Sequence, residues 1–130
     1  MGQTQARATN APSLEQLEQA ARAPGADRAA RLRWGWALYA GGRYGEAATV
    51  AWESSTSASG DPEPAYLLGM ALKASGDKTG AAAAFKTASE NVSGIHSEVR
   101  AAMLRRLAIG QANWLLRGDW DLEPETWERT

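Results

Sequence analysis

The sequence predicts a single all-α domain, and three observations lead to that prediction. Apolar residues recur at the three- and four-residue spacing of amphipathic helices. Helix caps and helix-breaking Gly or Pro residues separate these stretches. No segment alternates apolar and polar residues with the period of two that half-buried strands show. At 130 residues, the chain is long enough to bury a core without disulfides or metals.

A polar arm and a short helix open the chain. Residues 1–12 are mostly small and polar and are expected to form a disordered arm. Ser13 and Gln16 have the spacing of a capping box, in which each side chain accepts a hydrogen bond from the backbone N–H of the other residue. Apolar residues recur at helical spacing after Ser13, so the first helix is expected over residues 14–22.

Five further helices follow, separated by capping and helix-breaking residues. Asp27 is a favourable cap for the second helix, and Asp61 is one for the fourth, with Pro62 at the first helical position. A short additional helix could begin at Pro124. The five ranges expected are 28–40, 44–57, 62–74, 79–90 and 95–116.

An internal repeat runs through these helices. A large apolar residue precedes a glycine, and alanine follows two positions later, in Trp34-Gly35-Trp36-Ala37, Leu68-Gly69-Met70-Ala71 and Ile109-Gly110-Gln111-Ala112. A second glycine comes about two helical turns on, at Gly42, Gly76 and Gly118. The first two copies are 34 residues apart, and the first glycine of the third copy lies 41 residues after that of the second.

This pattern resembles the tetratricopeptide repeat, a helical hairpin with a period of about 34 residues. The first copy has Trp34 where the family has Leu and Ala51 where it has Phe, and neither of the first two copies has Pro at the closing position. The resemblance covers about residues 28–120. The second copy matches best, with family residues at Leu68, Gly69, Gly76, Ala81 and Phe85.

The resemblance implies an α-solenoid, a right-handed superhelix of helical hairpins with an N-terminal helix on the first hairpin and a C-terminal cap. It makes residues 13–130 one domain, with repeats at about 28–61, 62–95 and 96–130. Glycine and alanine suit such hairpins because small side chains let the backbones of two helices approach closely. The second glycine of each copy is expected to end its helix in the left-handed conformation.

In this family the first helix of each hairpin lines a concave groove that holds a partner. Some members clamp a C-terminal carboxylate with Lys, Arg and Asn, but Leu32, Trp36, Tyr66 and Met70 stand at those places, so no such clamp is expected. Carrying the groove positions over predicts a largely apolar and aromatic surface, which suits an amphipathic helix or an extended peptide. The predicted groove comprises Leu32, Trp36, Tyr39, Tyr66, Met70, Lys73, Leu107, Gln111 and Trp114.

The tryptophans and the C-terminal segment leave alternatives open. Trp34 and Trp52 are expected to fill the core between Ala-rich helices, whereas Trp36 either faces the groove or packs against the N-terminal helix. Residues 119–130 mix acidic with large apolar side chains. They either cap the last repeat or occupy the groove of the same or a neighbouring chain.

No feature of the sequence indicates catalysis or metal binding, so no catalytic residue, metal ligand or cofactor is expected. The chain has no Cys and one His, His96, which rules out a thiolate zinc site or a pair of histidine ligands. It contains neither a Gly-x-Ser-x-Gly elbow nor a phosphate-binding glycine loop.

Charge and hydropathy narrow the class of partner. The formal net charge of −1 argues against a general nucleic-acid binder. The longest apolar stretch, residues 34–40, is too short to span a bilayer, and the polar start lacks the apolar region of a signal peptide, so a cytoplasmic protein without membrane association is expected. We therefore expect an adaptor, small chaperone or assembly factor that binds another protein or a peptide. The alternative is a structural protein that forms a homo-oligomer through the same groove.

Overall fold

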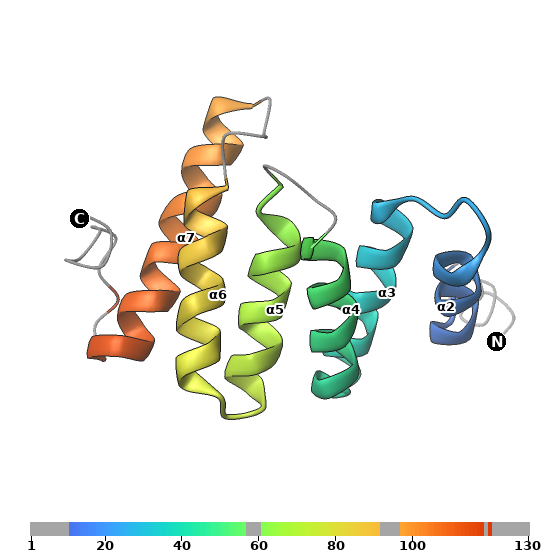
Figure 1. Cartoon of the computed structure of the whole chain (residues 1–130), viewed down its shortest axis with the longest axis horizontal. Helices are drawn as coiled ribbons and strands as arrows, with labels where there is room; N and C mark the ends of the chain where they lie inside the picture. The colour runs from blue at the N-terminus through green and yellow to red at the C-terminus, as the bar shows by residue number, and fades with distance from the viewer. Residues whose placement is uncertain (1–10, 57–60, 92–96, 119, 121–130) are drawn as a thin grey trace, which may run out of the picture.

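A computed structural model describes residues 11–56, 61–91, 97–118 and 120. These residues are all α and contain no strand. Each helix packs on the next one along the chain, and α3 also contacts α5, so the helices stand in a row from α2 to α7 (Figure 1). The helices are α2 (Leu14–Arg22), α3 (Arg28–Ala40), α4 (Tyr44–Thr56), α5 (Glu63–Ala74), α6 (Lys78–Glu90) and α7 (Glu98–Arg117).

Side-chain caps begin most of these helices. The capping box before α2 is confirmed, because the Gln16 N–H donates to Ser13 Oγ at 3.1 Å and the Ser13 N–H donates to Gln16 Oε1 at 2.8 Å. Asp27 caps α3 as expected and accepts a hydrogen bond from the backbone of Ala30 at 2.9 Å. Asp61 accepts from the backbone N–H of Glu63 at 3.0 Å, but α5 begins at Glu63 with Pro62 at its N-cap, one residue later than expected.

Two helix starts differ from expectation because of a cap that the pattern did not single out. α6 begins at Lys78 because the side chain of Asp77 accepts from the Gly80 N–H at 2.9 Å. α7 begins at Glu98, three residues later than expected, because Ser97 Oγ accepts from the Arg100 N–H at 3.3 Å. The helix-ending glycines behave as expected, with left-handed φ of 81° at Gly42, 94° at Gly76 and 79° at Gly118.

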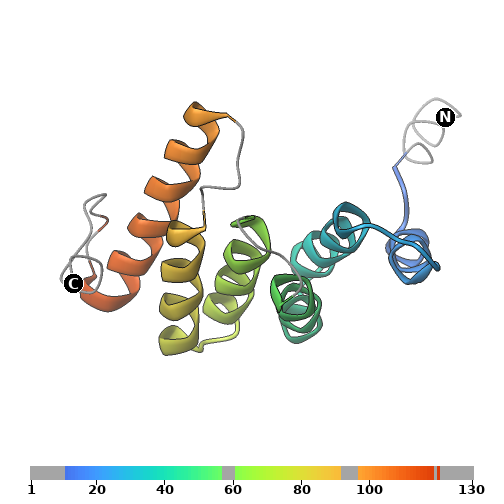
Figure 2. The same ribbon diagram turned by 45° about the horizontal axis from the view of Figure 1, so that its top comes forward.

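Alanine supplies most of the buried hydrophobic side chains. Because the alanine side chain is small, consecutive helices lie close together. Figure 2 shows α3 to α7 side by side in chain order from a second direction. A few large side chains fill the remaining space, and Leu38, Leu67, Phe85 and Ile109 are at most 1% exposed. None of the helices in the described ranges is long and apolar enough to cross a membrane.

The repeated glycine of α3, α5 and α7 makes room for a side chain. A Cβ built on Gly35 would lie 2.7 Å from Leu67 Cδ2, and one on Gly69 would lie 2.7–2.8 Å from three atoms of the Phe85 ring. A Cβ on Gly110 would lie 2.6 Å from Trp120 Cε2. Each of these glycines therefore seats a large side chain from a later part of the chain, and at Gly69 that side chain comes from the second helix of the same hairpin.

Several expectations fall on residues outside the described ranges. These are most of the N-terminal arm, at residues 1–10, the side chain of His96, and the short helix after Pro124.

Candidate interaction surfaces

The predicted groove begins on α3, where one of its residues belongs to the core. Leu32 is 5% exposed and packs with Ala51 and Leu67, so its side chain is closed to a partner. Trp36 and Tyr39 are half-buried on the same cluster, and their rings meet edge to face with centroids 5.9 Å apart. Trp36 therefore packs on a cluster formed by α3, α4 and α5.

The groove positions of α5 and α7 are joined by polar contacts. Lys73 Nζ donates to Gln111 Oε1 at 2.8 Å, and Gln111 Nε2 lies 3.5 Å from the sulfur of Met70. Gln111 is only 8% exposed, so its amide serves the protein interior and is not open to a partner. The ring of Tyr66 packs edge to face on Phe85 at 5.3 Å.

The last two predicted groove residues, both on α7, are exposed. Trp114 is 49% exposed and Leu107 is 37% exposed. Leu107 lines a separate cavity on the outer side of α7, together with Met103 and Trp120. The structure therefore does not bring all nine predicted residues into one open groove.

Charged side chains occupy the part of the predicted groove where α3 meets α5. The indole N–H of Trp36 donates to Glu63 Oε2 at 2.9 Å, and the other oxygen of Glu63 lies 3.9 Å from Arg100 of α7. Arg28 pairs with Asp61 at 3.2 Å. Arg28, Asp61 and Glu63 line a cavity of about 320 Å³ together with Trp36, so this end of the surface is polar.

A second surface lies between α4 and α6, with α5 as its floor, and we call it the α4–α6 groove. Its cavity is about 520 Å³. None of its lining residues is charged, and most are alanine or other small residues. They are Ala48, Thr49, Trp52, Ser55, Ala65, Leu68, Leu72, Gly80, Ala83, Ala84 and Thr87.

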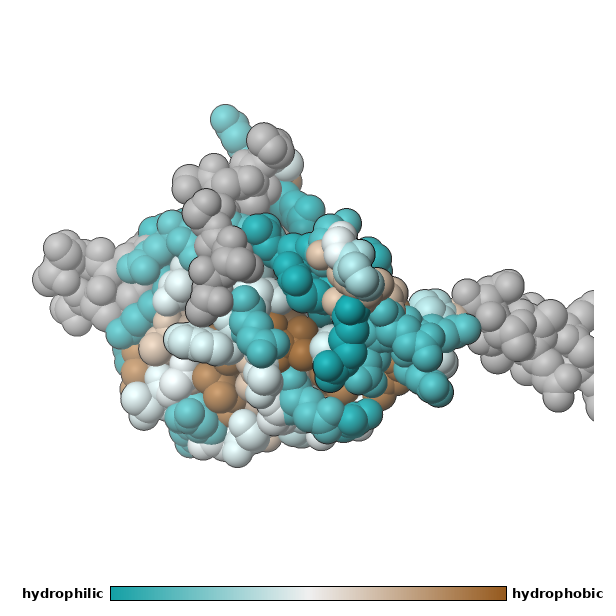
Figure 3. All heavy atoms as spheres, turned by 45° about the vertical axis from the view of Figure 1, so that its right-hand side comes forward, coloured by the Kyte–Doolittle hydropathy of each residue, from teal (hydrophilic) through white to brown (hydrophobic). Residues whose placement is uncertain are grey.

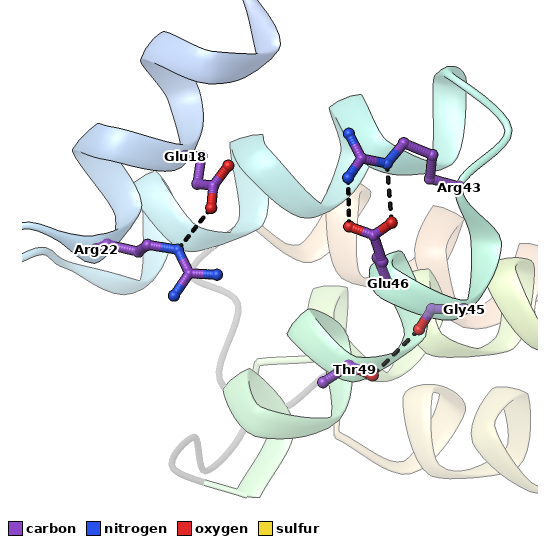
Figure 4. A network of polar contacts seen from close by, with 6 residues as sticks. All are labelled: Glu18, Arg22, Arg43, Gly45, Glu46 and Thr49. Carbon is purple, nitrogen blue, oxygen red and sulfur yellow. Dashed lines mark hydrogen bonds and ion pairs between the residues drawn. The ribbon is translucent and has the colours of Figure 1, made fainter.

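The three hydroxyl groups of the α4–α6 groove already donate to their own helices. Thr49 donates to the carbonyl of Gly45 at 3.1 Å (Figure 4), Thr87 to Ala83 at 3.1 Å, and Ser55 to Trp52 at 2.8 Å. Since their hydrogens are used internally, the groove presents methyl groups and aromatic carbon to whatever enters it. An uncharged apolar surface is the complement of such a groove.

Trp52 corrects one expectation about the core. Its side chain is 60% exposed and lines the α4–α6 groove, whereas the sequence predicted a core residue. Trp34 is half-buried and packs against the cluster of Leu38 and Val50, as expected, with the guanidinium of Arg22 5.0 Å from its ring. A large exposed indole beside an apolar cavity is the kind of residue that contributes most to protein interfaces.

Sequence reasoning missed the α4–α6 groove, although one signal for it exists. Ala48, Trp52 and Ser55 follow helical spacing on α4, and Gly80, Ala83, Ala84 and Thr87 do so on α6. The row on α6 consists of small residues, and Ala48 and Ser55 flank Trp52 on α4, so space is left between these two helices. The pattern becomes informative only when those two helices are known to flank a third.

The surface around α2 and the start of α4 is ordinary. On the side of the molecule that carries α2, hydrophobic residues form small patches between hydrophilic ones (Figure 3). Exposed ion pairs join Arg22 to Glu18 at 2.8 Å and Arg43 to Glu46 at 2.6 Å (Figure 4). The hydrogen bond with Glu46 raises the pKa of Arg43 above its usual value. Exposed pairs of this kind contribute little to stability.

The described residues contain no cluster of side chains that could hold a metal ion. Across the ranges that the structure covers, no three His, Cys, Asp or Glu side chains lie together as metal ligands would. Comparison of the chain with protein-family models, with curated proteins and with solved structures finds no match. The likeness to tetratricopeptide repeats therefore rests on the residues of the repeat itself.

Proposed function

We propose that this protein is a protein–protein interaction module that holds a helix or peptide of another protein, as an adaptor, small chaperone or assembly factor does. In this proposal the helices are tetratricopeptide-like hairpins in a right-handed superhelix, with α2 on the first hairpin and a cap at the C-terminal end. The consecutive packing of α2 to α7 and the seated glycines of α3, α5 and α7 support it.

The observation that carries the proposal is the α4–α6 groove. It is apolar, uncharged and about 520 Å³ in volume, and Trp52 stands 60% exposed at its edge. Exposing such a surface to water is unfavourable, by about 25 cal/mol for each Å² of apolar area. A partner that covers it with an apolar helix face recovers that free energy, and the indole adds a large contact area with few rotatable bonds.

The predicted groove remains a second surface for a partner. Trp36, Tyr39, Tyr66 and Met70 are half-buried, and Trp114 is exposed. Its polar contacts favour a partner that also brings hydrogen-bonding groups, in contrast to the α4–α6 groove.

The alternative function, self-association, has one specific observation in its favour. Trp52 projects from the same face that carries the apolar cavity, so two copies related by a two-fold axis can each insert this side chain into the groove of the other. In that case the oligomer interface is the α4–α6 groove and not the predicted groove.

The test compares one charged substitution on each surface. Wild type, Trp52→Glu, and the Trp36→Glu, Tyr66→Glu double variant serve as baits for proteins from the native cell's lysate. Leu116→Glu is the matched control, because Leu116 is 49% exposed and lines neither surface. Circular dichroism checks that each variant keeps its helices, and sedimentation at several concentrations reports self-association.

Each outcome selects one reading. A protein that is captured by wild type and by Leu116→Glu but lost with Trp52→Glu supports the α4–α6 groove. Loss only with the double variant assigns binding to the predicted groove. A dimer that Trp52→Glu dissociates, with no other protein captured, supports self-association. A monomer that captures nothing contradicts the proposed function.

A further inference from the structure

The outer face of α7 exposes a row of large apolar side chains. Val99 is 74% exposed, Met103 is 56% and Leu107 is 37%, and they follow one another at intervals of four residues. Together with Ala102, Arg106 and Trp120 they line a cavity of about 550 Å³. Every earlier helix from α3 to α6 has a following helix packed against it, whereas no described helix follows α7.

Trp120 shows where the chain goes after α7. The helix ends at Gly118, which has the left-handed φ of 79° that turns a chain back on itself. Two residues later the indole of Trp120 lies over Gly110, so close that a Cβ there would be 2.6–2.7 Å from two of its ring atoms. Phe85 occupies the same position over Gly69 within the α5–α6 hairpin.

We infer that residues 121–130 run from Trp120 back along the outer face of α7, cover Met103 and Val99, and complete a third hairpin in the same chain. The length is sufficient. From Gly110 back to Val99 the helix extends about 16 Å over eleven residue steps. The ten residues after Trp120 span about 15 Å as a helix and about 33 Å when extended. Leu122 and Trp127 supply large apolar side chains for the contact.

The charges of the two segments are complementary. α7 carries four arginines and one glutamate, and residues 121–130 carry four carboxylates and one arginine. Arg106 lines the cavity itself, beside Met103 and Leu107. The attraction orients an acidic segment along this helix, and the apolar side chains account for most of the contact.

This inference specifies the C-terminal cap of the proposed function, and it is independent of partner binding, because the outer face of α7 shares no lining residue with the α4–α6 groove. A partner can bind that groove whether or not residues 121–130 cover α7.

The absence of cysteine allows a direct test on the full chain. A nitroxide attached at Glu125→Cys broadens the NMR signals of nearby methyl groups. We expect the methyl groups of Met103, Val99 and Leu107 to broaden more than those of Leu68 and Leu72 in the α4–α6 groove. A sample that mixes spin-labelled chains with isotope-labelled chains lacking the nitroxide reports any contact between molecules.

A charge in the apolar row should release the segment. Met103→Glu is expected to lower the ratio of docked to free segment about tenfold, since burial of a Met side chain is lost and a carboxylate faces an acidic segment. Leu116→Glu, on the same helix but outside the cavity, is expected to leave the broadening unchanged. Circular dichroism confirms that both variants keep α7.

Broadening of the α7 methyl groups within one molecule, lost with Met103→Glu and kept with Leu116→Glu, supports the inference. Three results overturn it: strongest broadening at Leu68 and Leu72, broadening of the α7 methyl groups that also appears in the mixed sample, or none. The first places the segment in the α4–α6 groove, the second places it on a neighbouring chain, and the third leaves it free. Broadening that survives Met103→Glu also contradicts the inference.

Discussion

The α3–α4 and α5–α6 hairpins have a glycine at the same place in their first helix, but different side chains cover it. Over Gly69 lies the ring of Phe85, which belongs to the same hairpin and is fully buried. Over Gly35 lie Leu67, from the next hairpin, and Val50 from its own. The difference follows from one position of the repeat, where the first hairpin has Ala51 and the second has Phe85, both fully buried.

Each copy of the repeat leaves a space beside its first glycine, but the side chain that fills this space differs from copy to copy. Where the second helix of a hairpin has a large residue, the hairpin closes on itself. Where that residue is alanine, a side chain from the neighbouring hairpin enters, which couples the two hairpins. The third glycine, Gly110, is covered by Trp120 from the chain after α7. Substitution of each of the three glycines by alanine tests how firmly its space is filled, because each substitution adds one methyl group to one space.

Gly69→Ala is expected to have the largest effect. The new Cβ would lie 2.7–2.8 Å from three atoms of a rigid, fully buried ring, so Phe85 or the helix must move. Overpacking of this kind costs about 1–3 kcal/mol, against about 1 kcal/mol gained from helix propensity. We expect a net loss of up to about 2 kcal/mol in the free energy of unfolding, measured with urea.

Two further variants isolate the cause in Gly69→Ala. Gly45 lies in α4 with nothing within 4 Å of an added Cβ, so Gly45→Ala should stabilise the protein by about 0.5–1 kcal/mol. In a Phe85→Leu background, Gly69→Ala should cost less than in the wild type, since the smaller side chain can yield. Equal stabilities for Gly69→Ala and Gly45→Ala would falsify the account.

Gly35→Ala is expected to have a smaller effect, a loss of about 0.5–1 kcal/mol. The nearest atom, Leu67 Cδ2 at 2.7 Å, is the end of a rotatable side chain, and Val50 Cγ1 lies at 3.2 Å. Because Leu67 belongs to the next hairpin, a Leu67→Ala background should reduce the cost of Gly35→Ala, and a Phe85→Leu background should not. If urea unfolding showed a lower cost of Gly35→Ala in the Phe85→Leu background and not in the Leu67→Ala background, the proposed packing of Leu67 on Gly35 would be wrong.

Gly110→Ala is expected to change stability least, by less than about 0.5 kcal/mol, because the helix-propensity gain offsets a lost contact at the surface. Trp120 is 47% exposed and can move away from the added methyl group. The measurement is the indole N–H signal of Trp120 in an NMR spectrum, assigned with Trp120→Phe, which should shift while the other five indole signals stay in place. A large loss of stability would mean that Trp120 is fixed as firmly as Phe85.

Much of the local structure could be predicted from the sequence, because the causes lie within a few residues of their effects. The capping box at Ser13, the cap at Asp27 and the left-handed glycines at helix ends each depend on neighbouring backbone groups. The repeat of 34 residues likewise located the glycines that seat large side chains. The missed starts of α6 and α7 also have local causes, in Asp77 and Ser97.

Which side chains are exposed on the surface could not be predicted in the same way. Leu32 and Gln111 were placed in a groove and are buried, and Trp52 was placed in the core and is exposed. The spacing of residues along a helix defines its faces but does not say which neighbour covers each face.

The sequence by itself therefore determined the helices, their ends and the positions of the spaces between them, through hydrogen bonds and backbone conformations that act over one helical turn. Only the tertiary structure decided which side chain fills each space and which face stays open. That outcome depends on the sizes of side chains such as Ala51 and Phe85, which are both fully buried, and on small residues such as Ala48 and Ala83, which line the α4–α6 groove.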